Sequence, residues 1–410
     1  MMKETKELKC AYFMLIIAFA ALIGLGMVNV FSATFVGDSA GGNFFYHLSR
    51  QALFCLVGLA GGFVMYKLGY RFWQPHMKWL VLLSIILLAA VLVGGIVING
   101  ARRWLGMGIF TFQPSEVAKL ASIIYAAVHL ADSVKKGKTI ELLYSIPHVR
   151  ILGHHVRAIP HTALWVPFLM FLLVMEQPDA GTAFVIVAIP IFMVLAGGAR
   201  LAPIKWHCAI LAAGAVLYLL SAPYRLNRIT AWLDPWEYQK TLGYQTVQGL
   251  IAIGSGGISG QGLGNGISKF QYLPEAHTDF AFAILAQESG LIGSVIILLL
   301  FCMIVYFGMM TVSHCRDSFG MFTALGITLY FGGQGFINIS MVCGLLPVVG
   351  VPLPFISYGG TSLVINMLAA SLLLNICRHT YKKAAEQEKK RQQPILRSMK
   401  EETRSQFPLR

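Results

Sequence analysis

Long apolar runs separated by short polar segments dominate the hydrophobic pattern of this chain. Runs of about the length of a membrane span lie at residues 11–33, 50–66, 79–98, 115–133, 206–222, 280–310, 321–345 and 360–377. A bilayer core needs about 20 apolar residues per helix, so each run predicts one transmembrane helix. Glu176 and Asp179 interrupt the region 163–198, where we predict two short helices that form a hairpin. The pattern therefore predicts an all-α polytopic membrane protein with about ten transmembrane helices.

Composition agrees with this pattern and excludes a soluble globular protein. Of the 410 residues, 56% are hydrophobic and only 12% are charged, too few for an ordinary wet surface. No small-residue cleavage site accompanies the first apolar run, so we expect a retained helix and not a removed signal peptide. The seven cysteines occur singly with no regular spacing, which predicts neither a disulfide framework nor a zinc site.

The distribution of positive charge predicts the orientation. Cytoplasmic loops carry the excess of Lys and Arg, and ten spans with both termini cytoplasmic place 24 of the 32 basic residues inside. A single crossing by 163–198 would turn the basic tail outward. We therefore predict a cytoplasmic N-terminus at 1–10, a transmembrane domain at 11–378, and a basic, disordered cytoplasmic tail at 379–410. A large extracytoplasmic loop, 223–279, lies between spans 7 and 8, and the net charge of +14 indicates no nucleic-acid partner.

Charged residues that run against these rules are the first candidates for function. Arg102 and Arg103 lie near the outer interface, where paired guanidinium groups suit a phosphate. Trp104 beside them either belongs to the same site or is an interfacial belt residue. Glu116 and Lys119 lie three residues apart on one face of a predicted helix, at membrane depth. They form either a neutralised structural pair or a functional site, and the sequence leaves both readings open.

Two segments rich in glycine or proline are predicted to lie beside the outer site. IAIGSGGISGQGLGNG, residues 251–266, lacks the strand that a dinucleotide site requires, so we expect a flexible loop there and no phosphate cradle. PVVGVPLPFISYGGTS, residues 347–362, separates two spans. Non-helical backbone at that depth persists only where protein or water covers it. We therefore expect a cavity-lining connection, which contains Ser357 and Tyr358.

The stretch YLPEAHTDFAF, residues 272–282, places Glu275, His277 and Asp279 within five residues at the outer mouth of a predicted span. A carboxylate at Asp279 could simply cap the N–H groups of the following helix. Because several arginines lie on the same face, the group could instead bind a lipid with a phosphate headgroup and take a proton from a substrate.

Three long motifs carry a family resemblance. ARRWLGMGIFTFQPSEVAKLA, GQGLGNGISKFQYLPEAHTDFAFAILAQESGLIG and GLLPVVGVPLPFISYGGTSL together resemble the SEDS family, the shape, elongation, division and sporulation proteins that include RodA, FtsW and SpoVE. The similarity runs from about residue 11 to 378. TAWLDPWEY, QGLGNG and LPEAHTDF resemble the FtsW and SpoVE branch more than RodA. The AQESG motif has Gln287 where the family commonly has an acid, so only Glu288 matches there.

The resemblance implies a peptidoglycan glycosyltransferase at the outer face of the bacterial cytoplasmic membrane. Its substrate would be lipid II, the undecaprenyl pyrophosphate-linked disaccharide pentapeptide, which it would extend into β-1,4 glycan strands. The implied partners are a cognate class B penicillin-binding protein and other divisome or elongasome membrane proteins. The family's critical aspartate falls on Asp279, which we expect to be the general base. A divalent cation, Mg²⁺ or Mn²⁺, could assist at the phosphates, and no nucleotide is expected.

We expect the substrate-binding set to comprise Arg102, Arg103, Trp104, Glu116, Lys119, Glu275, His277, Glu288, Ser357 and Tyr358. Arg102, with Arg103 or Lys119, would stabilise the leaving pyrophosphate. Two other functions fit the sequence. A lipid II flippase or transporter would also contain broken helices and intramembrane charges, whereas a non-catalytic scaffold would only recruit the penicillin-binding protein and would tolerate Asp279→Asn.

Overall fold

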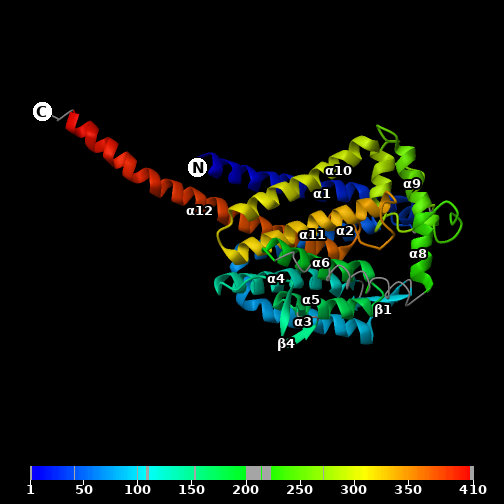
Figure 1. Ribbon diagram of the computed structural model, residues 1–410. Coiled ribbons are helices and arrows are strands. Elements are labelled where there is room, and N and C mark those ends of the chain that lie inside the picture. Colours follow the sequence, from blue (N-terminus) through cyan, green and yellow to red (C-terminus); the bar gives the residue numbers. More distant parts are fainter. Residues whose placement is uncertain are drawn as a thin grey trace.

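The computed structural model describes residues 2–40, 42–98, 100–107, 110–151, 154–199, 214, 223–270 and 272–406. Within these ranges the chain is a bundle of helices with two small antiparallel sheets (Figure 1). The predicted span at 206–222 lies outside the described residues, apart from residue 214.

The described helices are α1 (Met2–Ala40), α2 (Tyr46–Leu68), η1 (Tyr70–Phe72), α3 (Trp73–Gly94), α4 (Pro114–Lys135), α5 (Thr162–Met175), α6 (Ala180–Ala196), α8 (Pro223–Leu233), α9 (Tyr244–Gly256), α10 (Ala281–His314), α11 (Ser318–Val342) and α12 (Gly360–Gln406). Six helical segments of the described chain are long and apolar enough to cross a membrane, and they fall on α1, α2, α3, α4, α10 and α12. The chain is therefore a membrane protein. α11 and the shorter helices α5 and α6 pack among these six helices, so six is the lower bound on the number of spans.

The region 163–198 folds into two short helices, as the sequence predicts. α5 and α6 pack against each other and against α4. The turn between them ends at Asp179, whose carboxylate accepts a hydrogen bond from the backbone N–H of Thr182 at 3.2 Å and so caps α6. The acid that interrupts the apolar pattern is thus needed to begin the second helix.

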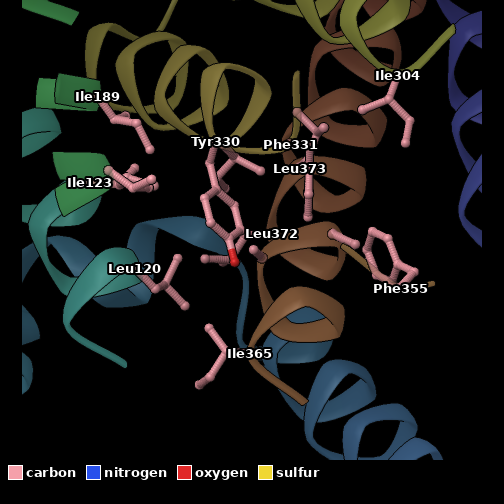
Figure 2. Close-up of a cluster of buried hydrophobic side chains, with 14 of the residues drawn as sticks. Leu120, Ile123, Ile189, Ile304, Tyr330, Phe331, Phe355, Ile365, Leu372 and Leu373 are labelled. Atoms are coloured by element: carbon pink, nitrogen blue, oxygen red, sulfur yellow. The ribbon is translucent and has the colours of Figure 1, made fainter. Parts of the chain in front are cut away.

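α11 lies at the centre of the bundle, in contact with α4, α6, α10 and α12. Figure 2 shows Tyr330 of α11 surrounded by apolar side chains, with Leu120 and Ile123 of α4 on one side and Leu372 of α12 on another. The Tyr330 hydroxyl donates to the Asn366 side chain at 2.5 Å. Lipid tails are as apolar as these side chains, so close van der Waals packing and buried hydrogen bonds hold such helices together.

Two small sheets correct the expectation of an all-helical fold. β1 (Ile96–Ile98), β2 (Ala101–Met107) and β3 (Phe110–Phe112) form one antiparallel sheet in that order, and β4 (Leu143–Ile151) pairs with β5 (His154–Pro160) in a second. Both lie in connections between helices, where β-branched and aromatic residues are frequent. Strand pairing there satisfies backbone groups that no helix satisfies. β1 also shortens the predicted third span, because α3 ends at Gly94.

Both chain ends lie at one end of the bundle, whereas β1, α8 and α9 lie at the other, here called the loop end (Figure 1). Tyr12 of α1 packs against Tyr381 of α12, with ring centroids 5.8 Å apart. α12 does not stop at residue 378 but runs on to Gln406, where we expected a disordered tail. Residues 379–393 contain no glycine or proline and are rich in Ala, Glu, Gln and Lys, which favour helix.

The predicted extracytoplasmic loop 223–279 also contains regular structure. α8 and α9 fall within it. α9 packs on α10 and α11. The loop is therefore folded against the bundle over much of its described length.

The connection between α11 and α12, residues 343–359, is non-helical and lies at the loop end, as predicted. Phe355 has a φ of +68°, a left-handed conformation that bulky side chains rarely adopt. α1 crosses the connection so closely at Gly26 that an added Cβ would overlap the carbonyl oxygen of Phe355. Glycine at this position therefore permits α1 to hold the connection in its strained shape.

We expect Gly26→Ala to destabilise the folded chain by about 1–3 kcal/mol, because the inserted methyl group overlaps backbone atoms that cannot rotate away. Gly24→Ala is the matched control, since nothing lies within 4 Å of a Cβ added there. Thermal unfolding of the two variants in detergent micelles measures the difference. Equal midpoints would show that the contact between α1 and the connection yields without cost.

Candidate functional site

A cavity of about 400 Å³ opens at the loop end of the bundle. Its wall is formed by the beginning of α2, strand β2, the beginnings of α4, α6 and α12, the segment before α10 and the connection 343–359. Its charged lining residues are Arg50, Arg103, Asp179, Glu275 and Asp279. The fold thus gathers acids and guanidinium groups from four separate parts of the sequence into one space.

Asp279 lies two residues before the first residue of α10. Its backbone carbonyl accepts a hydrogen bond from the Asn338 side chain at 2.8 Å, which fixes the residue against α11. The N-cap position of α10 is Phe280, and no side chain caps this helix. The carboxylate instead lines the cavity, with one oxygen beside Gly350. The sequence left open whether Asp279 caps the following helix, and the structure shows that it does not cap α10.

The surroundings of Asp279 favour its protonated form. Burial raises the pKa of this carboxyl to about 7, the negative charges of Glu275 and Asp179 add to the shift, and Arg103 opposes it. A carboxylate with a pKa near neutrality can accept a proton and release it again at physiological pH, which a general base requires.

Glu275 faces the same cavity from a strained position. Its φ of +53° lies in the left-handed region, which is uncommon for residues other than glycine. Its side chain accepts a hydrogen bond from the Thr278 hydroxyl at 2.5 Å, and its backbone carbonyl accepts from the N–H groups of Thr278 and Phe280. Strain of this kind is common at functional sites, where surrounding contacts hold it in place.

Of the two predicted arginines, only Arg103 lines the cavity. Successive residues of a strand point to opposite faces, and Arg102 is exposed and donates to the Leu92 carbonyl at 3.4 Å. Arg103 donates to the Pro178 carbonyl and lies 4.0 Å from the Asp179 carboxylate. Trp104 lines the cavity as well, which favours its assignment to the site.

Arg50 is a cavity residue that the sequence analysis did not single out. It lies near the beginning of α2, donates to the Tyr46 hydroxyl at 2.6 Å and lies 5.4 Å from the centroid of that ring. Gln113 and Asp179 were also missed, and Gln113 stands at the N-cap position of α4. For Arg50 and Asp179, charge at the beginning of a predicted helix was the available signal, but only the fold shows which of these beginnings meet.

Glu116 and Lys119 do not line the cavity but form a buried network beside it. The Lys119 ammonium lies 2.8 Å from the Glu116 carboxylate and donates to the Gln334 side chain at 3.1 Å. Gln334 in turn donates to the carbonyl of Pro352 at 2.8 Å, in the connection 343–359. The pair therefore neutralises itself inside the bundle and supports a wall of the cavity. Glu116 and Lys119 are 1% exposed.

The remaining predicted site residues divide between the cavity and its supports. Tyr358 lines the cavity, and its backbone N–H donates to the His277 carbonyl at 2.8 Å. The His277 ring packs near His47 and Tyr358 outside the lining, and burial and His47 lower its pKa. The Ser357 hydroxyl accepts from the Leu353 N–H at 2.8 Å and shapes the connection. Glu288 lies away from the cavity, paired with a lysine.

Three carboxylates line the cavity, but their arrangement does not form a metal site by itself. Within the described ranges, no three His, Cys, Asp or Glu side chains come close enough together to hold a metal ion. A divalent cation in this cavity would therefore need ligands from a bound substrate in addition to those of the protein.

Comparison with known proteins identifies the family of this chain. Residues 13–382 match the FtsW/RodA/SpoVE family, described as "Cell cycle protein". Stage V sporulation protein E of Bacillus subtilis (strain 168) is 40% identical over 370 residues, which cover 90% of this chain and 97% of that protein. "Probable peptidoglycan glycosyltransferase FtsW" of Hahella chejuensis (strain KCTC 2396) is 37% identical over 361 residues, 87% of each chain.

Two solved structures share the fold. One, from work on "structural coordination of polymerization and crosslinking by a peptidoglycan synthase complex", gives a TM-score of 0.69 at 28% identity and covers 90% of this chain and 97% of that one. The rod shape determining protein RodA of Thermus thermophilus gives a TM-score of 0.60 at 26% identity, covering 90% and 96%. The family match over most of the chain and these relatives confirm the resemblance: the chain belongs to the FtsW/RodA/SpoVE family of cell cycle proteins.

Proposed function

We propose that this chain is a peptidoglycan glycosyltransferase that polymerises lipid II into β-1,4 glycan strands. The names of its relatives support this activity. The observation that carries the assignment is the Asp279 carboxylate, which lines a cavity together with Arg103 and Arg50 and caps no helix. A base and cations in one enclosed space are what a transfer from a pyrophosphate donor needs.

The chemistry follows from these positions. A sugar hydroxyl of the acceptor gives its proton to Asp279 as its oxygen bonds to the anomeric carbon of the donor. The bond from that carbon to the lipid pyrophosphate breaks at the same time, and the pyrophosphate leaves with the electron pair. Arg103 and Arg50 stabilise the negative charge that develops on it. A single displacement converts an α-linked donor into a β-linked product, as in inverting glycosidases.

Cofactor use remains part of the proposal. The energy for transfer lies in the donor pyrophosphate, so no nucleotide is needed. A divalent cation, Mg²⁺ or Mn²⁺, would be held by the phosphates of the substrate with one or two cavity carboxylates, which is how Mg²⁺ commonly binds. None of the steps above depends on it.

The proposed site faces outward from the bacterial cytoplasmic membrane. We keep the ten-span arrangement with both termini cytoplasmic, because 24 of the 32 basic residues then lie inside. Both chain ends lie at the same end of the bundle, which supports an even number of membrane crossings (Figure 1). The cavity lies at the opposite end and is therefore extracytoplasmic.

The proposed partner is a class B penicillin-binding protein, joined by other divisome or elongasome membrane proteins. The structural neighbour from a peptidoglycan synthase complex supports such an assembly. The relatives named FtsW and stage V sporulation protein E favour a role in cell division or sporulation over one in elongation. A flippase is less well supported, because Glu116 and Lys119 pair with each other and are not among the residues that line the cavity.

Asp279→Asn is expected to lower the polymerisation rate by at least a hundredfold, since general-base catalysis contributes about 10²–10⁴. The chain is purified with its penicillin-binding partner, whose transpeptidase serine is inactivated, and given lipid II. Asp234→Asn is the control, because Asp234 is exposed, belongs to the same predicted loop and does not line the cavity. Full polymer from Asp279→Asn, with normal folding, would refute the general base, whereas no polymer from either chain would favour a flippase or a scaffold.

The pH dependence provides a second test. Only ionised Asp279 can accept the proton, and its raised pKa of about 7 keeps much of it protonated in mildly acidic solution. The rate should therefore be low near pH 5.5, rise through about pH 7 and level off above about pH 8. Initial rates of polymer formation over this range would reveal the midpoint. A rate already at its maximum at pH 5.5 would contradict the proposed environment of Asp279.

Arg103→Gln is expected to reduce kcat/KM about 10- to 100-fold, because a hydrogen bond to a charged phosphate contributes about 1.5–3 kcal/mol. Arg102→Gln makes the same chemical change one residue away on the opposite face of β2. It should leave the rate within about twofold, since Arg102 does not line the cavity. Equal losses in the two variants would indicate a general effect of charge near the membrane surface and not a binding site.

A further inference from the structure

The helix that follows Asp279 is broken one-third of the way along its length. Gly290 in α10 has φ +66° and ψ −161°, values outside any helix, and separates the outer turns that begin at Ala281 from the long inner part. Glycine is required there, because a Cβ would overlap the backbone nitrogen of Gly260 in the glycine-rich loop. Glycine at position 290 therefore permits both the break in α10 and the close contact between α10 and that loop.

Loop backbone replaces the helical hydrogen bonds that the break removes. The N–H groups of Gln261 and Gly262 donate at 3.0 Å to the carbonyls of residues 287 and 288. In the other direction, the N–H groups of Leu291 and Ile292 donate to the carbonyls of residues 257 and 258 at 2.9 and 3.2 Å. We call this set of four bonds the clasp. The glycine-rich segment, expected to be a flexible loop, is thus bonded directly to the broken helix.

A buried ion pair locks the clasp in place. The Lys269 ammonium lies 2.9 Å from the Glu288 carboxylate, and both side chains are 2% exposed. The Ser32 hydroxyl of α1 donates to the same carboxylate at 2.6 Å, and Lys269 also donates to the Gly264 carbonyl at 2.6 Å. Loop, α10 and α1 therefore meet at one carboxylate.

The outer turns of α10 are held at their other end as well. The Asn29 side chain of α1 donates to the carbonyl of Ala281 at 3.1 Å. Asn29 and Ser32 lie one turn apart on α1, whereas Ala281 and Glu288 lie about two turns apart on α10. The Gln287 side chain adds a bond to the Ser255 hydroxyl at 2.9 Å, at the end of α9. The segment 281–288 is thus fixed to α1 and to the loop, and Asp279 is attached directly before it.

We infer that Lys269 and Glu288 are positioning residues for Asp279. By locking the clasp, they fix the outer turns of α10 and hence the place of the Asp279 carboxylate in the cavity. Neither residue lines the cavity, so neither touches the substrate. The inference extends the proposed function, since it assigns the support of the same general base.

The use of charge in this lock has a physical reason. Apolar side chains would pack against each other in several sliding arrangements, whereas a buried ammonium and carboxylate are satisfied only when they meet. A single unpaired charge in such a place is strongly unfavourable. The pair therefore favours one register between loop and helix over its neighbours, at little or no gain in stability over an apolar pair.

The test compares Lys269→Met/Glu288→Met with Lys240→Met in the full chain. The double variant removes both charges and leaves none unpaired, so the chain should still fold. Lys240 is exposed in the same predicted loop and controls for the loss of a positive charge. Amide hydrogen exchange is followed at the four donors of the clasp and in a peptide covering residues 278–283, and kcat and KM are measured with lipid II.

We expect the double variant to exchange about tenfold faster at the clasp and in the 278–283 peptide. Its kcat should fall at least tenfold with KM within about twofold, because a misplaced base slows the chemical step without removing a substrate contact. Lys240→Met should match the wild type throughout. Wild-type protection of the 278–283 peptide in the double variant would overturn the inference, as would an unchanged kcat.

The exchange measurement does not depend on activity. If the wild-type chain forms no polymer, the proposed function fails, while faster exchange of the 278–283 peptide would still support the mechanical link from the lock to Asp279. If the wild type is active and the peptide keeps its protection, the proposed function stands and the positioning role is refuted.

Discussion

The structure depends on one constraint of the bilayer, namely that every backbone N–H and C=O at membrane depth must find a partner within the protein. In the described residues, the chain meets this constraint mainly with helices, and it departs from helix at Gly290 and in the connection 343–359. At the Gly290 break the partners come from the loop backbone, and in the connection 343–359 they come in part from Gln334 and Asn338 of α11. Gly290 lies in the helix that follows Asp279, and Gly350 of the connection lies beside the Asp279 carboxylate, so both departures are linked to the proposed base.

Polar side chains inside the bundle act mainly as supports for that irregular backbone. Asn338 donates both to the Asp279 carbonyl and to the Val351 carbonyl, and so joins the base to the connection that forms part of the cavity wall. Lys119 reaches the same connection through Gln334. Residues that look expensive in an apolar sequence are therefore accounted for by hydrogen bonds that an apolar side chain could not make.

The helical bundle, the hairpin at 163–198 and the broken connection could be predicted from the sequence, because hydrophobic length and helix breakers are local signals. Asp279 and Arg103 could be proposed from charge and motif. The separation of Arg103 from Arg102 could not, since it depends on strand pairing in a segment too short to predict. Arg50 and Asp179 were missed because their proximity to Asp279 is created only by tertiary packing. The role of Glu288 was misplaced for the same reason, as its partner Lys269 lies 19 residues away across a loop.

The length of α12 links the two ends of the molecule. Its first residues, Gly360 and Thr361, line the cavity, and the same helix extends to Gln406 beyond the bundle. At 1.5 Å per residue, 47 residues extend about 70 Å. Such a helix fixes the rotation about its axis as well as the distance along it. One residue inserted beyond residue 378 would rotate the helix after it by about 100° relative to the cavity. The rotation of the helix about its own axis beyond residue 378 is thus set, turn by turn, from the site.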